Sequence, residues 1–370
     1  MLTSASDRPD LFVRRALAPL PCPSGSGDVD RQGDRTWMWF TDPVDSIIAW
    51  ELDEVQPALA RVEAAAAEGL WAVGFVSYDA GPAFDSAVAS HRHADTPLLA
   101  FGLFESAAAD DPLAHDSEGG DFTVGPWAPT VDRAGFEAGV RSVKEHIAAG
   151  DTYQVNLTLR LHASFSGDPL GLFRSLARSQ GGDHLVYLDL GSRALCSASP
   201  ELFFRSTPLA DGGRRLVSKP MKGTRGRSSD VRADQLLVEE LLASEKDRAE
   251  NTMIVDMMRN DFGRIARVGT VTVPDLHTVE HFPTVHQMVT TVEAESDATL
   301  TEVFTSTFPP ASITGAPKVA TSTIITELEA DGRGSYCGAA GLIGPDGTAE
   351  FNVAIRSVWV DLDRERATYG

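Results

Sequence analysis

Cysteine and long apolar runs are both scarce in this chain. The sequence has three cysteines, Cys22, Cys196 and Cys337, which are odd in number and far apart. This spacing gives neither a disulfide framework nor a paired-cysteine metal motif. No segment approaches 18 consecutive apolar residues, so we expect no membrane span. The first residues show no apolar run after a basic head, unlike a signal peptide, and we expect a reduced, cytoplasmic protein.

Positive charge is also in short supply. Lys and Arg count 32 against 53 Asp and Glu, which gives a net charge of −21. Nucleic acids and anionic membranes need a basic face on their partners, so we exclude both as partners. A small anionic substrate is not excluded, because it responds to the local field of its pocket.

The remaining sequence predicts a globular protein with a sizeable core. Hydrophobic residues make up 42% and charged residues 23% of the 370 positions. Strands and helices occur in blocks rather than in strict alternation, which predicts an α+β fold with large, mostly antiparallel sheets. An acidic segment with Gly and Pro at 106–130 suggests a division into residues 1–125 and 126–370. We expect helices at 54–68, 132–151 and 232–262, and strands at 70–80, 152–165, 184–190, 194–198 and 201–206.

The stretch "SKPMKGTRGR", residues 218–227, follows a strand-like run and precedes a charged helix. Gly223, Thr224 and Gly226 indicate a bend directly after Lys222. If Lys222 is buried, its pKa falls and the amine can act as a nucleophile. If it is exposed, it is one of many surface lysines. The residues alone favour the exposed alternative.

Two carboxylates share one side of the helix expected at "SEKDRAENTMIVDMMRND", residues 244–261. Asp247 precedes Glu250 by three residues, and Glu250 precedes the apolar Ile254 by four. Carboxylates that border a core need a cation, and Mg²⁺ typically takes one or two of them together with substrate and water. The alternative is an exposed helix edge with salt pairs to Lys246 or Arg248, and spacing alone favours it.

One further segment and two further residues each allow two interpretations. In "SITGAPK", residues 312–318, a glycine turn leads into a helix, which forms either an anion site or an ordinary cap with Thr314 as the N-cap. Arg356, in an apolar strand, binds either a substrate carboxylate or a structural acid. His286, also in a strand, is more often a satisfied core residue than a catalyst.

Seven blocks in order strongly resemble the chorismate-utilising enzymes, which include anthranilate, aminodeoxychorismate, isochorismate and salicylate synthases. The blocks span about residues 130–359 and read "GDTYQVNLTLR", "SASPELFF", "KPMKGTRGR", "KDRAENTMIVDMMRNDFGR", "TVHQMV", "SITGAPKVA" and "GRGSYCGAAGLIG…FNVAIRS". The resemblance implies a sandwich of two large sheets with helices outside, as in anthranilate synthase component I. Water-adding members carry a lysine where this chain has Gln154. Its "PMKGT" resembles the lysine-containing bend of aminodeoxychorismate synthases.

The resemblance implies a role for each matching residue. Lys222 attacks C2 of chorismate, Glu201 protonates the departing C4 hydroxyl as general acid, and ammonia then displaces the lysine to give 4-amino-4-deoxychorismate. Mg²⁺ is held by Glu250 with Asp247 nearby, and His286 is counted among the catalytic residues. The positions expected to contact chorismate are Gly223, Thr224, Ser312, Thr314, Gly315, Tyr336 and Arg356.

Ammonia is expected from a separate glutamine amidotransferase subunit, because none of the three cysteines lies in a glycine elbow between a strand and a helix. Relatives usually continue into a glycine-rich turn and a helix with a second Mg²⁺ glutamate and a lysine. We therefore expect the metal site to be incomplete within 370 residues. The alternatives are anthranilate synthase component I and a catalytically incomplete module that binds chorismate or the amidotransferase.

Overall fold

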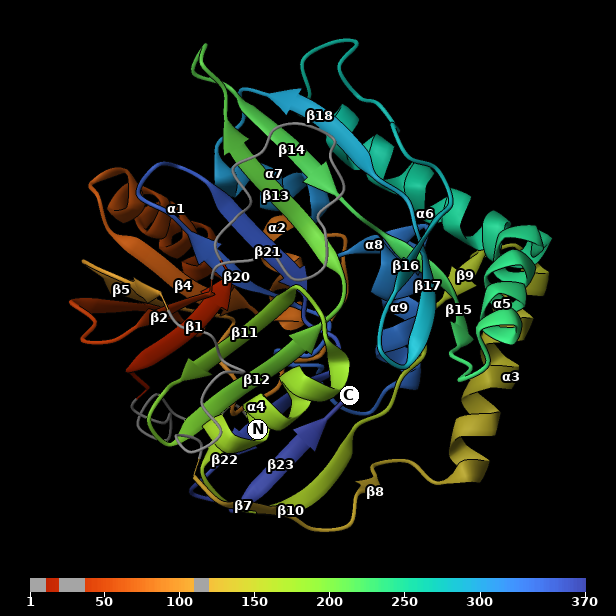
Figure 1. Ribbon diagram of the computed structural model, residues 1–370, viewed down its shortest axis with the longest axis horizontal. Helices are drawn as coiled ribbons and strands as arrows, with labels where there is room; N and C mark the ends of the chain where they lie inside the picture. The colour runs from red at the N-terminus through yellow and green to blue at the C-terminus, as the bar shows by residue number, and fades with distance from the viewer. Residues whose placement is uncertain (1–10, 20–36, 110–119) are drawn as a thin grey trace.

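Two large antiparallel sheets dominate the computed structural model, which describes residues 11–19, 37–109 and 120–370 (Figure 1). The first sheet has the order β6 (Ala108–Ala109), β2 (Trp37–Phe40), β1 (Arg15–Pro19), β11 (His184–Asp189), β12 (Arg193–Ser199), β22 (Ser357–Asp361), β23 (Arg366–Tyr369), β10 (Leu161–Gly167) and β7 (Phe122–Val124), and β8 (Ala128–Pro129) also pairs with β10. The second has the order β18 (Val292–Ser296), β14 (Arg214–Ser218), β13 (Leu202–Pro208), β21 (Ala349–Val353), β20 (Ala339–Ile343), β4 (Trp71–Val76), β5 (Leu99–Phe104) and β3 (Asp45–Ala49).

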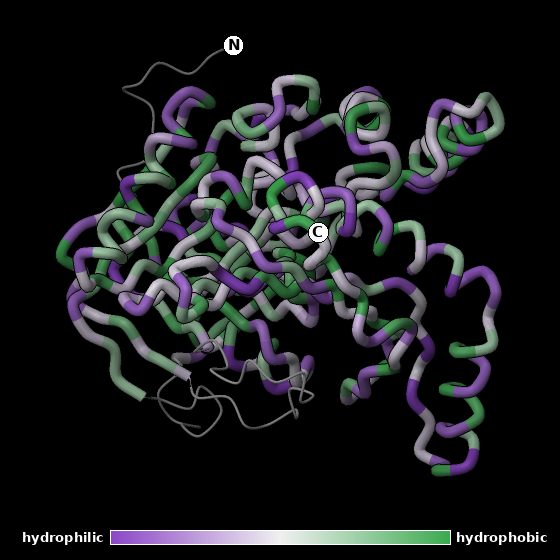
Figure 2. The backbone as a smooth tube through the Cα atoms, turned by 90° about the horizontal axis from the view of Figure 1, so that it is seen from above, coloured by the Kyte–Doolittle hydropathy of each residue, from purple (hydrophilic) through white to green (hydrophobic). Residues whose placement is uncertain are grey.

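The two sheets pack face to face across an aromatic and aliphatic core. The ring of Phe40 on the first sheet lies 5.5 Å from that of Phe104 on the second, measured between centroids. Phe75 and Trp359 make an edge-on contact across the same layer at 5.7 Å. Such pairs add about 0.5–1.5 kcal/mol each beyond the apolar area that they bury. The predicted sandwich is therefore confirmed, and Figure 2 shows hydrophobic segments running through the interior.

Helices cover the outer face of each sheet. On the second sheet, α1 (Leu52–Ala67), α2 (Gly81–Phe84) and α7 (Leu300–Thr307) bury apolar residues in one cluster with the C-terminal part of α6 (Glu245–Gly263). On the first sheet, α4 (Pro169–Gln180) packs through residues such as Phe173, whose ring lies 5.5 Å from that of Tyr187. The expected helix at 54–68 is confirmed as α1, which begins with a capping box of Glu51 and Glu54.

Three of the sequence predictions were wrong in detail. The strand expected over 70–80 ends at Val76, and a 3₁₀ turn follows at Tyr78–Ala80. The strand expected over 152–165 is split into β9 (Gln154–Val155) and β10, because the backbone of Asn156 turns to donate to the carbonyl of Thr314 at 3.0 Å. The single helix expected over 232–262 is split into α5 (Val231–Ala243) and α6. Ser244 is extended between them, and its hydroxyl accepts from the N–H of Asp247 as the N-cap of α6.

A smaller layer carries the residues of interest. The strands β15 (Met221–Gly226), β17 (Val285–Val289) and β16 (Thr278–His281) form a three-stranded sheet that packs against α5 and α6. A two-stranded sheet joins β9 to β19 (Gly315–Ala316), which lies between α8 (Ala311–Thr314) and α9 (Lys318–Leu328). Contacts of α6 with β15, α8 and β19, and of β19 with β9, bring the sequence blocks around residues 155, 222, 250 and 312 into one region.

The helix expected at 132–151 is confirmed as α3 (Arg133–Ala149), at the edge of the molecule (Figure 1). Asp132 caps its start, and Gly150 ends it in the left-handed region at φ 84°. Its apolar stripe is not fully buried, since Phe136 is 39% and Ile147 41% exposed. Amphipathic periodicity therefore located this helix but did not predict how little of it is covered.

The two parts proposed from the sequence, 1–125 and 126–370, remain a prediction. In space, both contribute strands to each large sheet: β1 pairs with β11, and β4 pairs with β20. Within the part of the chain that the structure describes, no helix has the length and apolar character needed to cross a bilayer.

Candidate active site

Lys222 lies on a strand that bulges toward a helix. The register between β15 and β17 shifts between Met221 and Thr224, so Lys222 and Gly223 depart from the regular ladder. Gly223 has a φ of 98°, and a Cβ there would lie 3.0 Å from the Cβ of Asp247 on α6. Glycine suits both this left-handed conformation and the close approach of the helix. Bulges of this kind re-aim the neighbouring side chain.

The amine of Lys222 meets an uncharged partner. Its Nζ donates to Oδ1 of Asn156 at 2.9 Å. Burial lowers the pKa of Lys222, and the carboxylates of Glu201 and Glu250 offset part of this effect. Lys222 is half-buried, so the exposed alternative favoured by the residues alone was wrong. A partly desolvated amine on a neutral acceptor is suited to nucleophilic attack.

Glu201 is a buried acid with the properties of a proton donor. It follows β12 and is 3% exposed. Burial raises its pKa to about 7, although the hydroxyl of Ser312 and the charge of Lys222 both act in the opposite direction. Glu201, Ser312 and Lys222, which are far apart in the sequence, therefore form one cluster. A carboxyl group with this pKa holds its proton in about half of the molecules at neutral pH.

The two carboxylates of α6 have different surroundings. Asp247 pairs with Arg225, with 3.0 Å between Oδ2 and Nη2, so its charge is already balanced by a guanidinium. Glu250 is half-exposed, its Oε1 lies 3.7 Å from Nζ of the exposed Lys246, and its charge raises the pKa of Lys222. Among the described residues, no three His, Cys, Asp or Glu side chains converge on one point. Glu250 fits the single protein carboxylate of a Mg²⁺ site completed by substrate and water, whereas Asp247 lies near it in an ion pair.

The segment from Ser312 to Gly315 passes close behind the cluster. Ser312 is 6% exposed and Thr314 fully buried. Thr314 donates its hydroxyl to the carbonyl of Pro310 at 3.0 Å, so the alternative of Thr314 as the N-cap of α9 was wrong. Gly315 has a φ of 135°, and a Cβ there would lie 2.1 Å from the carbonyl oxygen of Gln154. Glycine is thus required for β19 to pair with β9.

Arg356 is a half-buried cation without an acidic partner in the described residues. It lies in the bend just before β22 rather than in a strand as expected, has a positive φ of 50°, and donates from Nη1 to Oε1 of Gln180 at 2.6 Å. Burial lowers its pKa. Its carbonyl accepts from the N–H of Ala198 at 3.2 Å, which ties it to the segment that carries Glu201. The structural-acid alternative was therefore wrong, and the guanidinium remains available to an anion.

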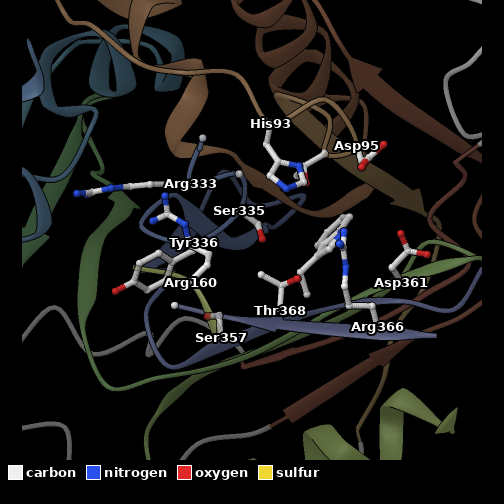
Figure 3. A pocket seen from close by; sticks show the side chains of 15 residues that line it. His93, Asp95, Arg160, Arg333, Ser335, Tyr336, Ser357, Asp361, Arg366 and Thr368 are labelled. Carbon is white, nitrogen blue, oxygen red and sulfur yellow. The ribbon is translucent and has the colours of Figure 1, made fainter. Parts of the chain in front are cut away.

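Tyr336 borders a small polar cavity rather than a substrate-sized one (Figure 3). Its hydroxyl lies 3.4 Å from the Thr158 hydroxyl, and burial raises its pKa. The cavity has a volume of about 30 Å³, which suits one or two water molecules. Nη1 of Arg160 and Nε of Arg366, both of which line it, are buried without a protein partner. Water would satisfy these donors.

His286 is not brought to the Lys222 cluster. Its ring is 1% exposed, and its Nε2 lies 2.9 Å from Oδ1 of Asp234 on α5. Its Nδ1 lies 2.7 Å from Nδ1 of His281. The catalytic assignment of His286 is therefore unsupported by its position, and the satisfied core residue is the better interpretation. Thr224, on β15, donates to Oε1 of Gln287 at 2.9 Å.

Two residues of the site were missed from the sequence. Asn156 holds Lys222, and Arg333 holds Asn156 by donating from Nη2 to its carbonyl at 2.8 Å. Arg333 is 5% exposed, also binds Glu329, and lies over the ring of Tyr78 at 4.5 Å. Both residues lie within blocks that carried the family resemblance, but neither has a spacing that reveals its role.

Residues 27–370 match the family model for chorismate binding enzymes. The chain belongs to this family. The resemblance inferred from the sequence blocks is thus confirmed, as is the fold class that it implied.

The relatives of this chorismate binding enzyme include more than one activity. Aminodeoxychorismate synthase component 1 of Escherichia coli (strain K12) is 35% identical over 312 residues, which are 78% of this chain and 68% of that protein. Anthranilate synthase component 1 of Streptomyces coelicolor is 37% identical over 273 residues, which are 73% of this chain and 50% of that protein. The structure of anthranilate synthase component I from Streptococcus pneumoniae superposes with a TM-score of 0.77 at 23% identity, covering 94% of this chain and 89% of that one.

Proposed function

We propose that this enzyme converts chorismate and ammonia to 4-amino-4-deoxychorismate, as an aminodeoxychorismate synthase. The observation that carries the proposal is the half-buried amine of Lys222. It is hydrogen-bonded to Asn156, and the charges of Glu201 and Glu250 act on its pKa. Similarity to aminodeoxychorismate synthase component 1 supports it, and so does Gln154, which replaces the lysine of water-adding relatives. The product would serve para-aminobenzoate and folate synthesis or a secondary pathway.

The reaction divides one displacement into two. The lone pair of the Lys222 amine attacks C2 of the ring, both ring double bonds shift by one position toward C4, and the C4–O bond breaks. Glu201 gives its proton to the departing hydroxyl, which leaves as water. Ammonia then bonds to C4, both double bonds return, and the C2–N bond to Lys222 breaks. The lysine leaves with the electron pair of that bond and is again a neutral amine, and a proton from the added nitrogen returns to Glu201.

Anion-binding groups would hold chorismate in place. Arg356 lacks an acidic partner among the described residues and suits a carboxylate of the substrate. Mg²⁺ would be held by Glu250, with Asp247 nearby and with substrate and water as further ligands. When bound, the ion neutralises and orients a carboxylate of the substrate. Gly223, Thr224, Ser312, Thr314, Gly315 and Tyr336 remain proposed contacts of chorismate.

Ammonia would come from a glutamine amidotransferase subunit. Cys196 and Cys337 are both buried, and burial raises the pKa of Cys337 to about 11. A thiol in this state is a poor nucleophile. Neither described cysteine therefore supplies a glutaminase function, and Cys22 lies outside the described residues.

The products formed with chorismate, Mg²⁺ and a high ammonia concentration test the proposal. We expect an amino-deoxychorismate that retains its pyruvyl ether. Anthranilate plus pyruvate would instead identify an anthranilate synthase component I, which the 37% identical relative makes the second candidate. Failure to form either product, in a protein that still binds chorismate, would leave only a binding module.

Omitting ammonia tests the covalent step. The intact protein should gain the mass of chorismate less one water, and Lys222→Ala should not. Lys246→Ala is a matched control, because this lysine lies on α6 with its side chain 81% exposed. An adduct on the Lys222→Ala protein would place the reaction elsewhere.

A further inference from the structure

Asn156 makes the side-chain hydrogen bond that holds the Lys222 amine. The irregular segment after β9 carries it, at the point where the expected strand is interrupted. Its Oδ1 accepts from Nζ of Lys222 at 2.9 Å. The amide contacts the amine through its oxygen, which accepts the hydrogen bond, and not through its Nδ2 donor. The contact therefore fixes the orientation of the amide as well as that of the lysine.

The backbone of Asn156 is fixed on two sides. Its N–H donates to the carbonyl of Thr314 at 3.0 Å, and its carbonyl accepts from Arg333 at 2.8 Å. Arg333 is held in turn by two contacts with Glu329, at 2.7 and 3.1 Å, and donates to the carbonyl of Ile313 at 2.9 Å. The amide oxygen is thus presented from a rigid base, which an exposed loop would not provide.

The amide of Asn156 also keeps an unused donor. Its Nδ2 is buried and has no partner in the described part of the chain. Buried amide donors in proteins are nearly always paired. An oxygen of a bound ligand, from a carboxylate or a hydroxyl, would satisfy this group at the side of Lys222.

We propose that Asn156 is the positioning residue of Lys222. One N–H of the amine is fixed on its neutral oxygen, so the lone pair is directed away from it toward the bound ring. An aspartate at this position would hold the amine equally well but would stabilise its ammonium form, which has no lone pair. The identity of the group that Lys222 attacks rests on the proposed function. The way in which Asn156 holds the amine does not.

The charged and titratable groups that act on Lys222 come from several elements. Burial lowers the pKa of Lys222, while Glu201, Glu250 and Cys337 raise it, in that order. A further carboxylate at position 156 would be in direct contact with Nζ. It would therefore oppose the effect of burial more strongly than the existing acids do.

The pH dependence of lysine labelling tests the proposal without catalysis. Pulses of acetic anhydride at several pH values, read by mass spectrometry of the peptides, give one profile for Lys222 and one for the exposed Lys246. In Asn156→Asp we expect labelling of Lys222 near pH 7 to be about tenfold slower than in the parent protein. The Lys246 profile should not move. A Lys222 profile that is unchanged in Asn156→Asp would overturn the proposal.

Two further variants distinguish the positioning of Lys222 by Asn156 from the effect of an added charge. Asn156→Ala removes the acceptor without adding charge, so adduct formation with chorismate should slow about a hundredfold, as expected for a misplaced nucleophile. Asn260→Asp adds a carboxylate at an exposed position of α6, away from Lys222. It should change neither the labelling profile of Lys222 nor that of Lys246. Adduct formation at the parental rate in Asn156→Ala would contradict a positioning role. Absence of an adduct in the parent protein would contradict the proposed function instead.

Discussion

Nη1 of Arg356 donates to Oε1 of Gln180 at 2.6 Å, so a neutral amide is the partner of a half-buried guanidinium. The fold thereby orients the arginine without neutralising it. A carboxylate in the place of Gln180 would make a structural ion pair and use up the charge. The pair of Lys222 and Asn156 repeats this arrangement, since a neutral amide again holds the nitrogen of a basic side chain without adding a negative charge.

Gln180→Glu should weaken chorismate binding. The new carboxylate would pair with Arg356 and compete with the substrate, so we expect the KM or Kd for chorismate to rise about tenfold. Gln180→Ala removes the contact but leaves the charge, and its effect should be within about threefold. Calorimetric titration of both variants with chorismate makes the comparison. Equal effects in the two would mean that the charge of Arg356 is not used for binding.

Gly223→Ala should destabilise the bulge. Its φ of 98° is unfavourable for alanine, and the added Cβ would lie 3.0 Å from Cβ of Asp247 and 3.1 Å from Cδ1 of Leu241. We expect a loss of about 1–3 kcal/mol in the free energy of unfolding, measured with urea. Gly226→Ala is the matched control on the same strand, because nothing lies within 4 Å of its Cβ. A loss of equal size in the control would show that the bulge geometry is not the cause.

Glu201→Gln should be more stable than the parent protein at alkaline pH. Burial raises the pKa of Glu201 from 4.5 to about 7, so the folded state binds this proton more tightly than the unfolded chain. The associated stability is present below pH 4.5 and is lost as pH rises through about 7. A neutral glutamine avoids the loss, which linkage places at about 3 kcal/mol.

Urea unfolding at pH 5 and pH 8 measures this difference. The advantage of Glu201→Gln should grow between the two values, toward about 2–3 kcal/mol. Glu239→Gln on the exposed side of α5 should show no such pH dependence. An advantage for Glu201→Gln that is the same at both pH values would exclude a raised pKa as its origin.

Lys318→Met should cost much of the stability of the region behind the site. Nζ of Lys318 lies 2.5 Å from Oδ2 of Asp261 and 2.6 Å from the carbonyl oxygen of Thr307, which joins the start of α9 to the ends of α6 and α7. Removing one partner leaves a buried carboxylate, and we expect a loss of about 3 kcal/mol in unfolding by urea.

The exposed pair on α6 provides the control for this substitution. Lys246 lies 3.7 Å from Glu250 and is largely solvent-accessible, so Lys246→Met should change stability by less than about 0.5 kcal/mol. The double variant Lys318→Met with Asp261→Leu should recover part of the loss, since no unpaired charge remains. No recovery would mean that Lys318 acts through packing rather than through charge.

Elements defined by local pattern were predictable from the sequence. Helical periodicity predicted a helix over 132–151, and the cap at Asp132 and the stop at Gly150 bound α3 at nearly the same residues. Patterns failed where distant contacts decide the backbone. Alternation over 152–165 suggested one strand, but a contact of Asn156 with Thr314 interrupts it. Helical periodicity over 232–262 continued through Ser244, although the chain breaks there to cap α6.

The sequence by itself determined which chemical groups the site contains. The order of the blocks around Lys222, Glu201, Glu250 and Arg356 was enough to assign the family, because each group is tied to a short local motif. It could not determine which of these groups would be buried or what would face them.

Only the tertiary structure decided how those groups behave. A lysine is nucleophilic or inert according to its desolvation and its neighbours, and these come from segments far from it in the chain. Asn156 lies 66 positions from Lys222, and Gln180 lies 176 from Arg356. The same packing turned His286 toward Asp234 and away from the cluster. Burial and charge are properties of the assembled layers, which no local pattern encodes.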